Sequence, residues 1–518
     1  MNALSVHAPV LLVATPLLAA FVVPLVAKLG STVRNAVVGV FTFLTASLAG
    51  LVAANVLAGS GAPSVYVFGA NPLNLTLPSG MHVPIRILFE VDGMSAFMIL
   101  ITALVAVAAT LYSFSYFKEH SGGEMYYPLL FLLLAAIFGM EETGDLFNFF
   151  VFLEIAGIAA CGLIGFRPWR GRSQEAAFKT MALYTLSGLF VLIALGLLYG
   201  QHGGLNIAYL SSRVGAGMLD LVALGLLVVA LGMKAGVAPM HMWALDAYGE
   251  APAPISAVLV ASSQASLYGL FRVLFTLFGA AVSVAALGWF LIALSVLTIF
   301  VGVTMALLQK DIKRLIAYGA VSQIGYMLLG VGVGFTTSGS RPAYGFVAMQ
   351  GGIFHMVNDA ACIGLLFLAA GAVHRASGTR DLNRMGGLGH DMKWTAALFA
   401  IGALALAGVP PFNGFSSKLL IYESSFAASP ILAAIAILSS ILLLAVFMKV
   451  FQAAFLGPRL LENVREASRG MLVSMLMLAV VVVVFGLFPG FFVDKLVTPA
   501  AKALWLGRDA YVRAVLGG

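Results

Sequence analysis

Four ionisable residues of this sequence, Glu154, Lys234, Asp359 and Lys418, lie within or beside long apolar runs. At the centre of a bilayer a charged side chain costs about 2.5–3.5 kcal/mol on the insertion scale, and such residues mark ion pathways or proton relays. Burial disfavours the charged form of a lysine, and a nearby carboxylate favours it. We therefore expect Glu154 and Lys234 to form a reversible proton site, with a structural hydrogen bond between helices as the alternative role of Glu154.

Both lysines stand next to residues that break helices. Lys234 is followed by Gly236 and Pro239, and Lys418 follows the sequence GVPPFNG at 408–414. Proline kinks or ends a helix, and irregular backbone at membrane depth is tolerated only inside protein or along a wet cavity. A lysine that extends its stem to the membrane surface is the alternative interpretation of Lys234.

Further polar side chains fall between the two lysines in the sequence. His355 and Asp359 are four residues apart, so they share one face of a helix. With Gln264 and Gln323 they predict a polar, hydrated row along the membrane midplane. Small polar residues that only join helices are the alternative. Three secondary candidates complete the set: His241, Asp145 and Tyr326.

The composition predicts a membrane protein without redox or metal chemistry of its own. Only 9% of the residues are charged and 61% are apolar, whereas soluble domains carry about 25% charged residues. The two cysteines form no CxxC pair, and no glycine-rich phosphate-binding motif follows a strand pattern. We therefore expect no cofactor, no metal and no nucleic-acid partner.

Apolar runs of about 20 residues, the length that crosses a bilayer, predict an all-α polytopic membrane protein with about 14 transmembrane helices. The runs cover 8–27, 33–58, 92–117, 126–141, 146–166, 176–200, 218–238, 254–278, 285–308, 313–334, 344–374, 394–424, 430–456 and 470–492. Helices 7 and 12 are the two broken ones. Paired broken helices are typical of internally repeated transporters, and the odd spacing of five helices requires the two repeats to be inverted.

This pattern predicts four segments. They are 1–117 with helices 1–3, 118–280 with helices 4–8 as the first repeat, 281–457 with helices 9–13 as the second, inverted repeat, and 458–518 with helix 14 and a tail. The tail mixes basic and aromatic residues, which is typical of an interfacial amphipathic helix; a frayed tail is the alternative.

Lysine and arginine are distributed unevenly among the predicted loops. The loops after odd-numbered helices carry 17 of them and the loops after even-numbered helices carry 4. Cytoplasmic loops hold the excess of basic residues. We therefore expect a bacterial or archaeal-type inner-membrane protein with both termini on the non-cytoplasmic side.

Five motifs, in order between about residues 90 and 455, resemble the proton-translocating antiporter-like subunits of respiratory complex I, Mrp-type Na⁺/H⁺ antiporters and membrane-bound hydrogenases. They are TGDLFNFFVFLE (143–154), MKAGVAPMHMWALDAYGEAPAP (233–254), KDIKRLIAYGAVSQIGYMLLG (310–330), HMVNDAACIGLLFLAAG (355–371) and GVPPFNGFSSK (408–418). The first and last are most similar to the branch that holds the D-type Mrp antiporter subunits and the membrane-bound hydrogenases. The resemblance implies that Glu154 and Lys234 gate a first half-channel, that His355 belongs to the central axis, and that Lys418 is the terminal proton site.

The sequence departs from the family pattern at three positions of the central row. Asp359 stands where members often have a second histidine, and Ile363 stands where they often have a lysine. Gln264 takes the place of a bridging lysine. The row has therefore lost two lysines and gained one carboxylate.

Residues and resemblance together predict an ion-translocating membrane subunit of a multisubunit respiratory-type or Mrp-type complex. The ion is the proton, with Na⁺/H⁺ exchange as a further option, and the partners are other membrane subunits and the lipid bilayer. A hydrogenase-like or NADH dehydrogenase-like redox module, or a cation antiporter, would supply the drive. Two alternatives stay open: a non-conducting membrane scaffold, and a proton-driven component that energises inorganic carbon uptake.

Overall fold

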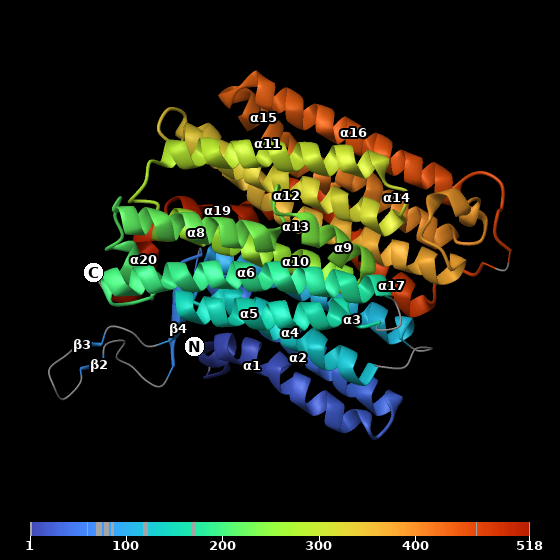
Figure 1. Cartoon of the computed structure of the whole chain (residues 1–518), viewed down its shortest axis with the longest axis horizontal. Helices are drawn as coiled ribbons and strands as arrows, with labels where there is room; N and C mark the ends of the chain where they lie inside the picture. The colour runs from blue at the N-terminus through green and yellow to red at the C-terminus, as the bar shows by residue number, and fades with distance from the viewer. Residues whose placement is uncertain are drawn as a thin grey trace.

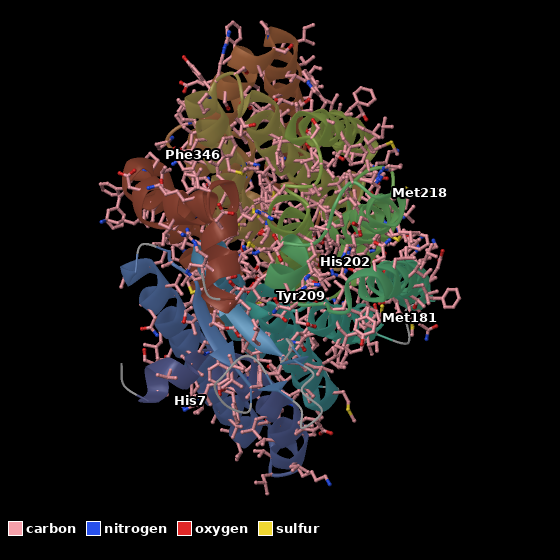
Figure 2. The ribbon with its side chains drawn as sticks, turned by 90° about the vertical axis from the view of Figure 1, so that its left-hand side faces the viewer. His7, Met181, His202, Tyr209, Met218 and Phe346 are labelled. Atoms are coloured by element: carbon pink, nitrogen blue, oxygen red, sulfur yellow. The ribbon has the colours of Figure 1, made fainter. Side chains whose placement is uncertain are left out.

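The computed structural model describes residues 3–59, 61–68, 75–76, 82–83, 87–117, 123–167, 171–462 and 464–516. Within these residues, 13 helices are long and apolar enough to cross a membrane, so the predicted all-α polytopic fold is confirmed. The helices run side by side, and both termini lie at one end of the bundle together with β2–β4 and α20 (Figure 1). We call this end the terminal side. Figure 2 looks onto it, with His202 and Tyr209 near the middle of the face.

The first part of the chain contains two long helices, two small two-stranded sheets and a third helix. Its elements are α1 Ala3–Ala27, α2 Ser31–Ala58, β1 Ser64–Val67, β2 Leu75–Thr76, β3 His82–Val83, β4 Leu88–Val91 and α3 Gly93–Tyr116. Strands β1 and β4 pair antiparallel with Val65 opposite Glu90, and β2 pairs antiparallel with β3.

The central part is helical throughout. Its first half has α4 Gly123–Glu142, α5 Leu146–Ile164, α6 Gly171–His202, α7 Ile207–Ser211, α8 Met218–Ala235, α9 Met242–Glu250, α10 Ala253–Phe271 and the π-helical turn η1 Arg272–Leu277. Its second half has α11 Val284–Leu308, α12 Ile312–Thr337, α13 Pro342–Ser377, η2 Leu382–Arg384, η3 Leu388–His390, α14 Lys393–Ala407, α15 Asn413–Ala428 and α16 Pro430–Phe455. The C-terminal part has α17 Arg469–Leu487, α18 Pro489–Phe492, η4 Val493–Val497, α19 Thr498–Trp505 and α20 Arg508–Leu516.

The two predicted helix breaks are confirmed. Helix α8 ends at Ala235, and Gly236 follows with φ 83°; helix α14 ends at Ala407, and Gly408 follows with φ 81°. Glycine adopts this left-handed conformation without the penalty that a Cβ would bring, and it commonly terminates helices. The predicted run 394–424 is therefore the pair α14–α15, which accounts for the fourteenth predicted crossing.

Three helices form the enclosed centre of the bundle. In α10, α12 and α13 every residue of the most apolar stretch is buried, and α13 packs against both others. These helices carry Gln264, Gln323, His355 and Asp359. The polar row is thus inside protein, which is where polar groups at membrane depth are tolerated.

The C-terminal tail folds back onto the bundle. Helix α20 packs against α7, β1 and η1, and the guanidinium of Arg508 donates to the backbone carbonyl of Ser211 at 2.5 Å. Tyr511 is buried. The predicted amphipathic tail therefore covers part of the terminal side of the protein.

Helices α11 and α12 approach so closely at Gly302 that only glycine fits. A Cβ added there would lie 2.6 Å from the backbone nitrogen of Ser322. We expect Gly302→Ala to lower the free energy of unfolding by about 1–3 kcal/mol, the usual effect of overpacking. Thermal unfolding in detergent measures it. Gly225→Ala is the matched control, because a Cβ there meets nothing within 4 Å; equal midpoints for both variants would contradict the prediction.

Candidate functional site

Glu154 of α5 and Lys234 of α8 form an ion pair inside the membrane-spanning part. The lysine Nζ lies 3.1 Å from Oε1 of Glu154 and donates to the backbone carbonyl of Leu153 at 3.0 Å. The lysine side chain is 3% exposed and the glutamate side chain 33%. Lys234 belongs to the last turn of α8, where the helix dipole favours a cation. The end of helix α8 thus holds the ammonium of Lys234 next to the carboxylate of Glu154.

Helix α6 supplies the rest of this site. The ring of Tyr184 lies 4.7 Å from Lys234 Nζ, a cation–π contact. Four residues further on, Gly188 faces the carboxylate so closely that a Cβ would collide with Glu154 Oε1. Sequence reasoning missed both residues. Their spacing shows only that they share a face of α6, and nothing in a single sequence relates that face to Lys234.

Gln264 and Asp359 join α10 to α13. The amide nitrogen of Gln264 donates to Asp359 Oδ2 and to the backbone carbonyl of Met356, both at 3.0 Å. The other oxygens of this pair, Gln264 Oε1 and Asp359 Oδ1, are buried without a hydrogen-bond partner. Ile363 is also fully buried on α13. The centre of the row therefore presents a carboxyl and an amide and no lysine.

His355 links three helices. Its Nε2 lies 3.0 Å from Gln323 Oε1 on α12, and its Nδ1 lies 2.9 Å from Ser417 Oγ on α15. His355 and Asp359 do share the expected side of α13, but each bonds to a different neighbour. The histidine faces toward Lys418, the next residue after Ser417.

Lys418 is completely buried. Its Nζ donates to the backbone carbonyl of Leu406 at 2.8 Å and to Ser440 Oγ at 2.7 Å, and it lies 4.5 Å from the ring of Tyr326. Leu406 is in the last turn of α14, where carbonyls have no helical partner. In the described part of the chain no carboxylate forms an ion pair with Lys418, so the helix break and a serine hold this lysine.

The secondary candidates differ in where they lie. Tyr326 belongs with Lys418, since its hydroxyl donates to the Ala436 carbonyl at 2.6 Å and lies 3.1 Å from Ser440 Oγ. His241 lies in the break between α8 and α9, buried, with Nδ1 unpartnered. Asp145 caps the start of α5 by accepting from the Asn148 amide at 2.9 Å, which is a helix-capping role.

The candidate residues thus gather into four polar groups. The groups are Glu154–Lys234, Gln264–Asp359, Gln323–His355–Ser417 and Lys418–Ser440–Tyr326. Among the described residues no side-chain hydrogen bond joins one group to the next, although Ser417 and Lys418 are neighbours in the chain. Water molecules are the physical means of connecting such groups.

Comparison with known proteins relates this geometry to one family. The family described as NADH:quinone oxidoreductase/Mrp antiporter, transmembrane, matches residues 143–448, a range that contains all four groups. The chain is 32% identical to NADH-quinone oxidoreductase subunit N of Desulforudis audaxviator, over 94% of this chain and 96% of that protein. It is 32% identical to a Na⁺/H⁺ antiporter subunit of Alkalihalophilus pseudofirmus, over 77% of this chain and 78% of that protein. A chain in the structure of the Mrp complex from a Dietzia species superposes with a TM-score of 0.87 at 26% identity, covering 99% of this chain and 100% of that chain.

Proposed function

Because this chain belongs to the NADH:quinone oxidoreductase/Mrp antiporter family, we propose that it moves protons through the four polar groups. It is a multi-pass, ion-translocating membrane subunit of a respiratory-type or Mrp-type complex. Its partners are the other membrane subunits of that complex. The roles of the individual residues, given below, are part of the proposal.

The observation that carries the proposal is the contrast between the two buried lysines. Lys234 is paired with Glu154, whereas Lys418 rests on a backbone carbonyl and a serine hydroxyl. When the first pair is closed, the carboxylate stabilises a proton on Lys234; when it opens, that proton is less stable and leaves. Gln264 with Asp359, and then Gln323 with His355, pass the change on to Lys418, which exchanges the terminal proton.

The proton is the ion that this donor set fits best. A lysine amine takes and releases a proton but is no ligand for Na⁺, and both ends of the row are lysines. Na⁺ is the second candidate, because Gln264 Oε1 and Asp359 Oδ1 are unpartnered oxygens and oxygens are the ligands of hard cations. Proton flux that persists without Na⁺ in membrane vesicles supports the proton, and flux that requires Na⁺ supports the exchange reaction.

We also propose how the chain is arranged in the membrane. The terminal side is the non-cytoplasmic side, because the loops predicted for the opposite end carry 17 of the loop lysines and arginines. Three of the counted residues, Arg86, Lys118 and Arg170, lie outside the described residues. Segments 118–280 and 281–457 are the two inverted repeats, since each contains one broken helix with a buried lysine beside the break.

Gly188 offers a test that leaves every ionisable group in place. Gly188→Ala puts a methyl group where Glu154 Oε1 lies, so the carboxylate must move away from Lys234. We expect proton flux in vesicles that contain the whole complex to fall severalfold, because positioned charges at membrane depth are functional. Gly196→Ala on the same helix is the control, since a Cβ there meets nothing within 4 Å. Equal flux in both variants would argue against the pair as a gate.

Two observations favour the scaffold alternative. Ile363 is buried at a position where the family resemblance implies a lysine. In the described residues the four groups share no continuous hydrogen-bonded path. A scaffold would keep its complex assembled and show no dependence of flux on Lys234 or Lys418.

A further inference from the structure

A second set of buried ionisable side chains lies on the terminal side, apart from the four polar groups. It consists of Glu90, Asp92, Glu141, Glu142 and Arg272, all of them buried. They come from strand β4, the start of α3, the end of α4 and the first residue of η1. We call these five residues the Arg272 cluster. The proposed proton path so far makes no use of them.

One carboxylate of the cluster has several partners, all of them on Oδ1. Asp92 pairs with Arg272 and caps α3 by accepting from the amides of Met94 and Ser95, both at 3.0 Å. Arg272 also donates to the Tyr268 hydroxyl at 3.0 Å and to Ser95 Oγ at 3.2 Å. The single cation of the cluster is therefore committed to Asp92.

The other three carboxyl groups lack such partners. Both oxygens of Glu90, both oxygens of Glu142 and Oε2 of Glu141 are buried without a hydrogen bond; only Oε1 of Glu141 accepts, from Thr102 at 2.6 Å. Burial raises the pKa of Glu90 well above its usual range; the charge of Arg272 and the nearby hydroxyl of Tyr511 act in the opposite direction. A buried carboxylate without a partner is very costly, and such a group takes up a proton instead.

Helix α10 connects this cluster to the midplane. Gln264, Tyr268 and Arg272 follow at intervals of four residues, so they lie along one side of the helix, about 6 Å apart in height. Gln264 bonds to Asp359 at one end. Toward the cluster, the Tyr268 hydroxyl donates to the backbone carbonyl of Glu141 at 3.1 Å and accepts from Arg272. These residues make a polar ladder from the central row to the cluster.

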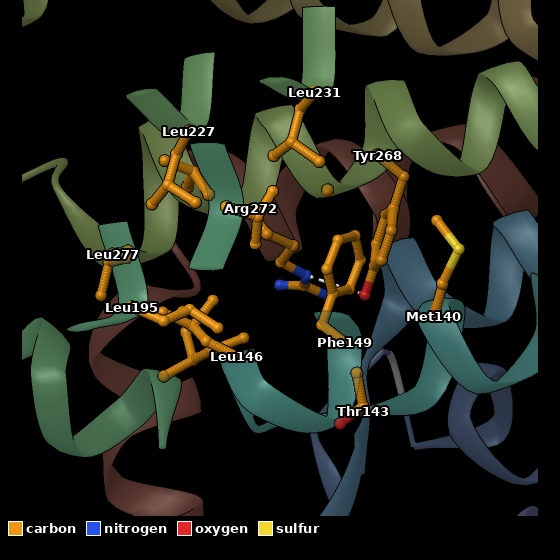
Figure 3. A pocket seen from close by; sticks show the side chains of 14 residues that line it. Met140, Thr143, Leu146, Phe149, Leu195, Leu227, Leu231, Tyr268, Arg272 and Leu277 are labelled. Carbon is orange, nitrogen blue, oxygen red and sulfur yellow. Dashed lines mark hydrogen bonds between the residues drawn. The ribbon is translucent and has the colours of Figure 1, made fainter. Parts of the chain in front are cut away.

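Two local features suggest a functional role, beyond stabilising the fold, for the end of the ladder at Arg272. The helix changes to π geometry at Arg272–Leu277, and π turns inside helices are frequent at functional sites. Arg272 and Tyr268 also line a cavity of about 20 Å³ that is otherwise mostly apolar, and Figure 3 shows their hydrogen bond at its edge. A cavity of this size holds about one water molecule.

We infer that the Arg272 cluster is a proton-exchange site on the terminal side, where Glu90, Glu141 and Glu142 receive protons along α10 and release them to water. The inference rests on the proposed proton translocation and adds the place on the terminal side where the protons leave the protein. Along α10 the proton passes through water beside Gln264, Tyr268 and Arg272, and at the cluster it is exchanged between water and a carboxyl group; each step moves one proton, with no other bond made or broken. Arg272 holds Asp92 and Tyr268 in place, and Tyr511 of α20, whose ring lies 5.0 Å from the guanidinium, covers the cluster.

The test uses vesicles that contain the intact complex. We expect Glu142→Gln and Glu90→Gln each to lower proton flux severalfold, and the double variant to lower it at least about fivefold, without loss of assembly. Infrared difference spectra should lose one protonated-carboxyl band in Glu142→Gln. Glu124→Gln, exposed at the opposite end of α4, is the control and should change neither readout.

The outcomes separate this inference from the function on which it rests. If Lys234→Met stops flux while the double glutamine variant keeps full flux, the cluster is no exchange site and the translocation path stands. If Lys234→Met leaves flux unchanged, both proposals fail. Uptake of Na⁺ that depends on Glu142 and carries no proton would overturn the assignment of the proton to this site.

Discussion

We expect Lys234→Met to stop proton flux in vesicles that contain the whole complex. The substitution keeps the length of the side chain and removes the ammonium that bonds Glu154 at 3.1 Å and the Leu153 carbonyl at 3.0 Å. Without it the site has no amine beside Glu154 that can alternate between a protonated and an unprotonated state. We expect a loss of at least about tenfold, in line with the functional role of ionisable residues at membrane depth.

A loss of flux must be separated from a loss of folding. Removing one partner of a fully buried ion pair destabilises a protein by about 3–5 kcal/mol, and the one-third exposure of Glu154 makes the cost here smaller. The double variant Lys234→Met, Glu154→Gln removes both charges, so it should recover the thermal midpoint but not the flux. Lys449→Met is the matched control, because that lysine is exposed and, among the described residues, donates to the backbone carbonyls of Leu307 and Gln309. Flux that recovers together with the midpoint would show that the pair is structural.

The sequence predicted the parts of this site that depend on local chemistry. The number of crossings followed from the apolar runs, and the two breaks followed from glycine and proline beside Lys234 and Lys418. The ion pair followed from the cost of isolated charge in a membrane. The first two inferences hold because each rests on a property of a single helix and its solvent, and the ion pair follows because an isolated charge in the membrane needs a partner.

The residues that sequence reasoning missed all act across helices. Ser440 holds Lys418 from α16, and Tyr184 and Gly188 face the ion pair from α6. The spacing of His355 and Asp359 predicted a shared side of α13, but not that one bonds to α12 and α15 and the other to α10. Which helix faces which is decided by packing, and a single sequence carries no direct record of it.

The Arg272 cluster illustrates the same limit at the terminal side. Its members are separated by up to 182 positions, from Glu90 to Arg272, and lie next to helix ends where charge is common. Their sequence context gave no reason to single them out. Only the fold, with α20 packed against η1 and β4 beside α4, shows that all five are buried and that Glu90, Glu141 and Glu142 have unpartnered carboxyl oxygens.

Substitutions of Lys418 test whether the buried lysines take up and release protons or act only as fixed positive charges. Lys418→Met should lower flux at least about tenfold, as expected for a functional ionisable residue inside the membrane. Lys418→Arg keeps a positive charge at the same place, but arginine stays protonated in proteins and cannot release a proton. We therefore expect the arginine variant to be as inactive as the methionine variant, measured as proton flux per assembled complex.

The environment of Lys418 makes this comparison informative. Among the described residues, the buried Lys418 donates to the Leu406 carbonyl and to Ser440 Oγ, and no carboxylate forms an ion pair with it. Ser440→Ala removes one acceptor and keeps the lysine, and it should retain much of the flux while lowering the thermal midpoint, since a lost buried hydrogen bond costs about 1–3 kcal/mol. If Lys418→Arg folds with a normal midpoint and supports full flux, Lys418 acts as a fixed charge, and the terminal proton must be carried by another group. If the arginine variant folds and flux is lost, the amine of Lys418 must release its proton during transport. The break between α14 and α15 then serves to position that amine.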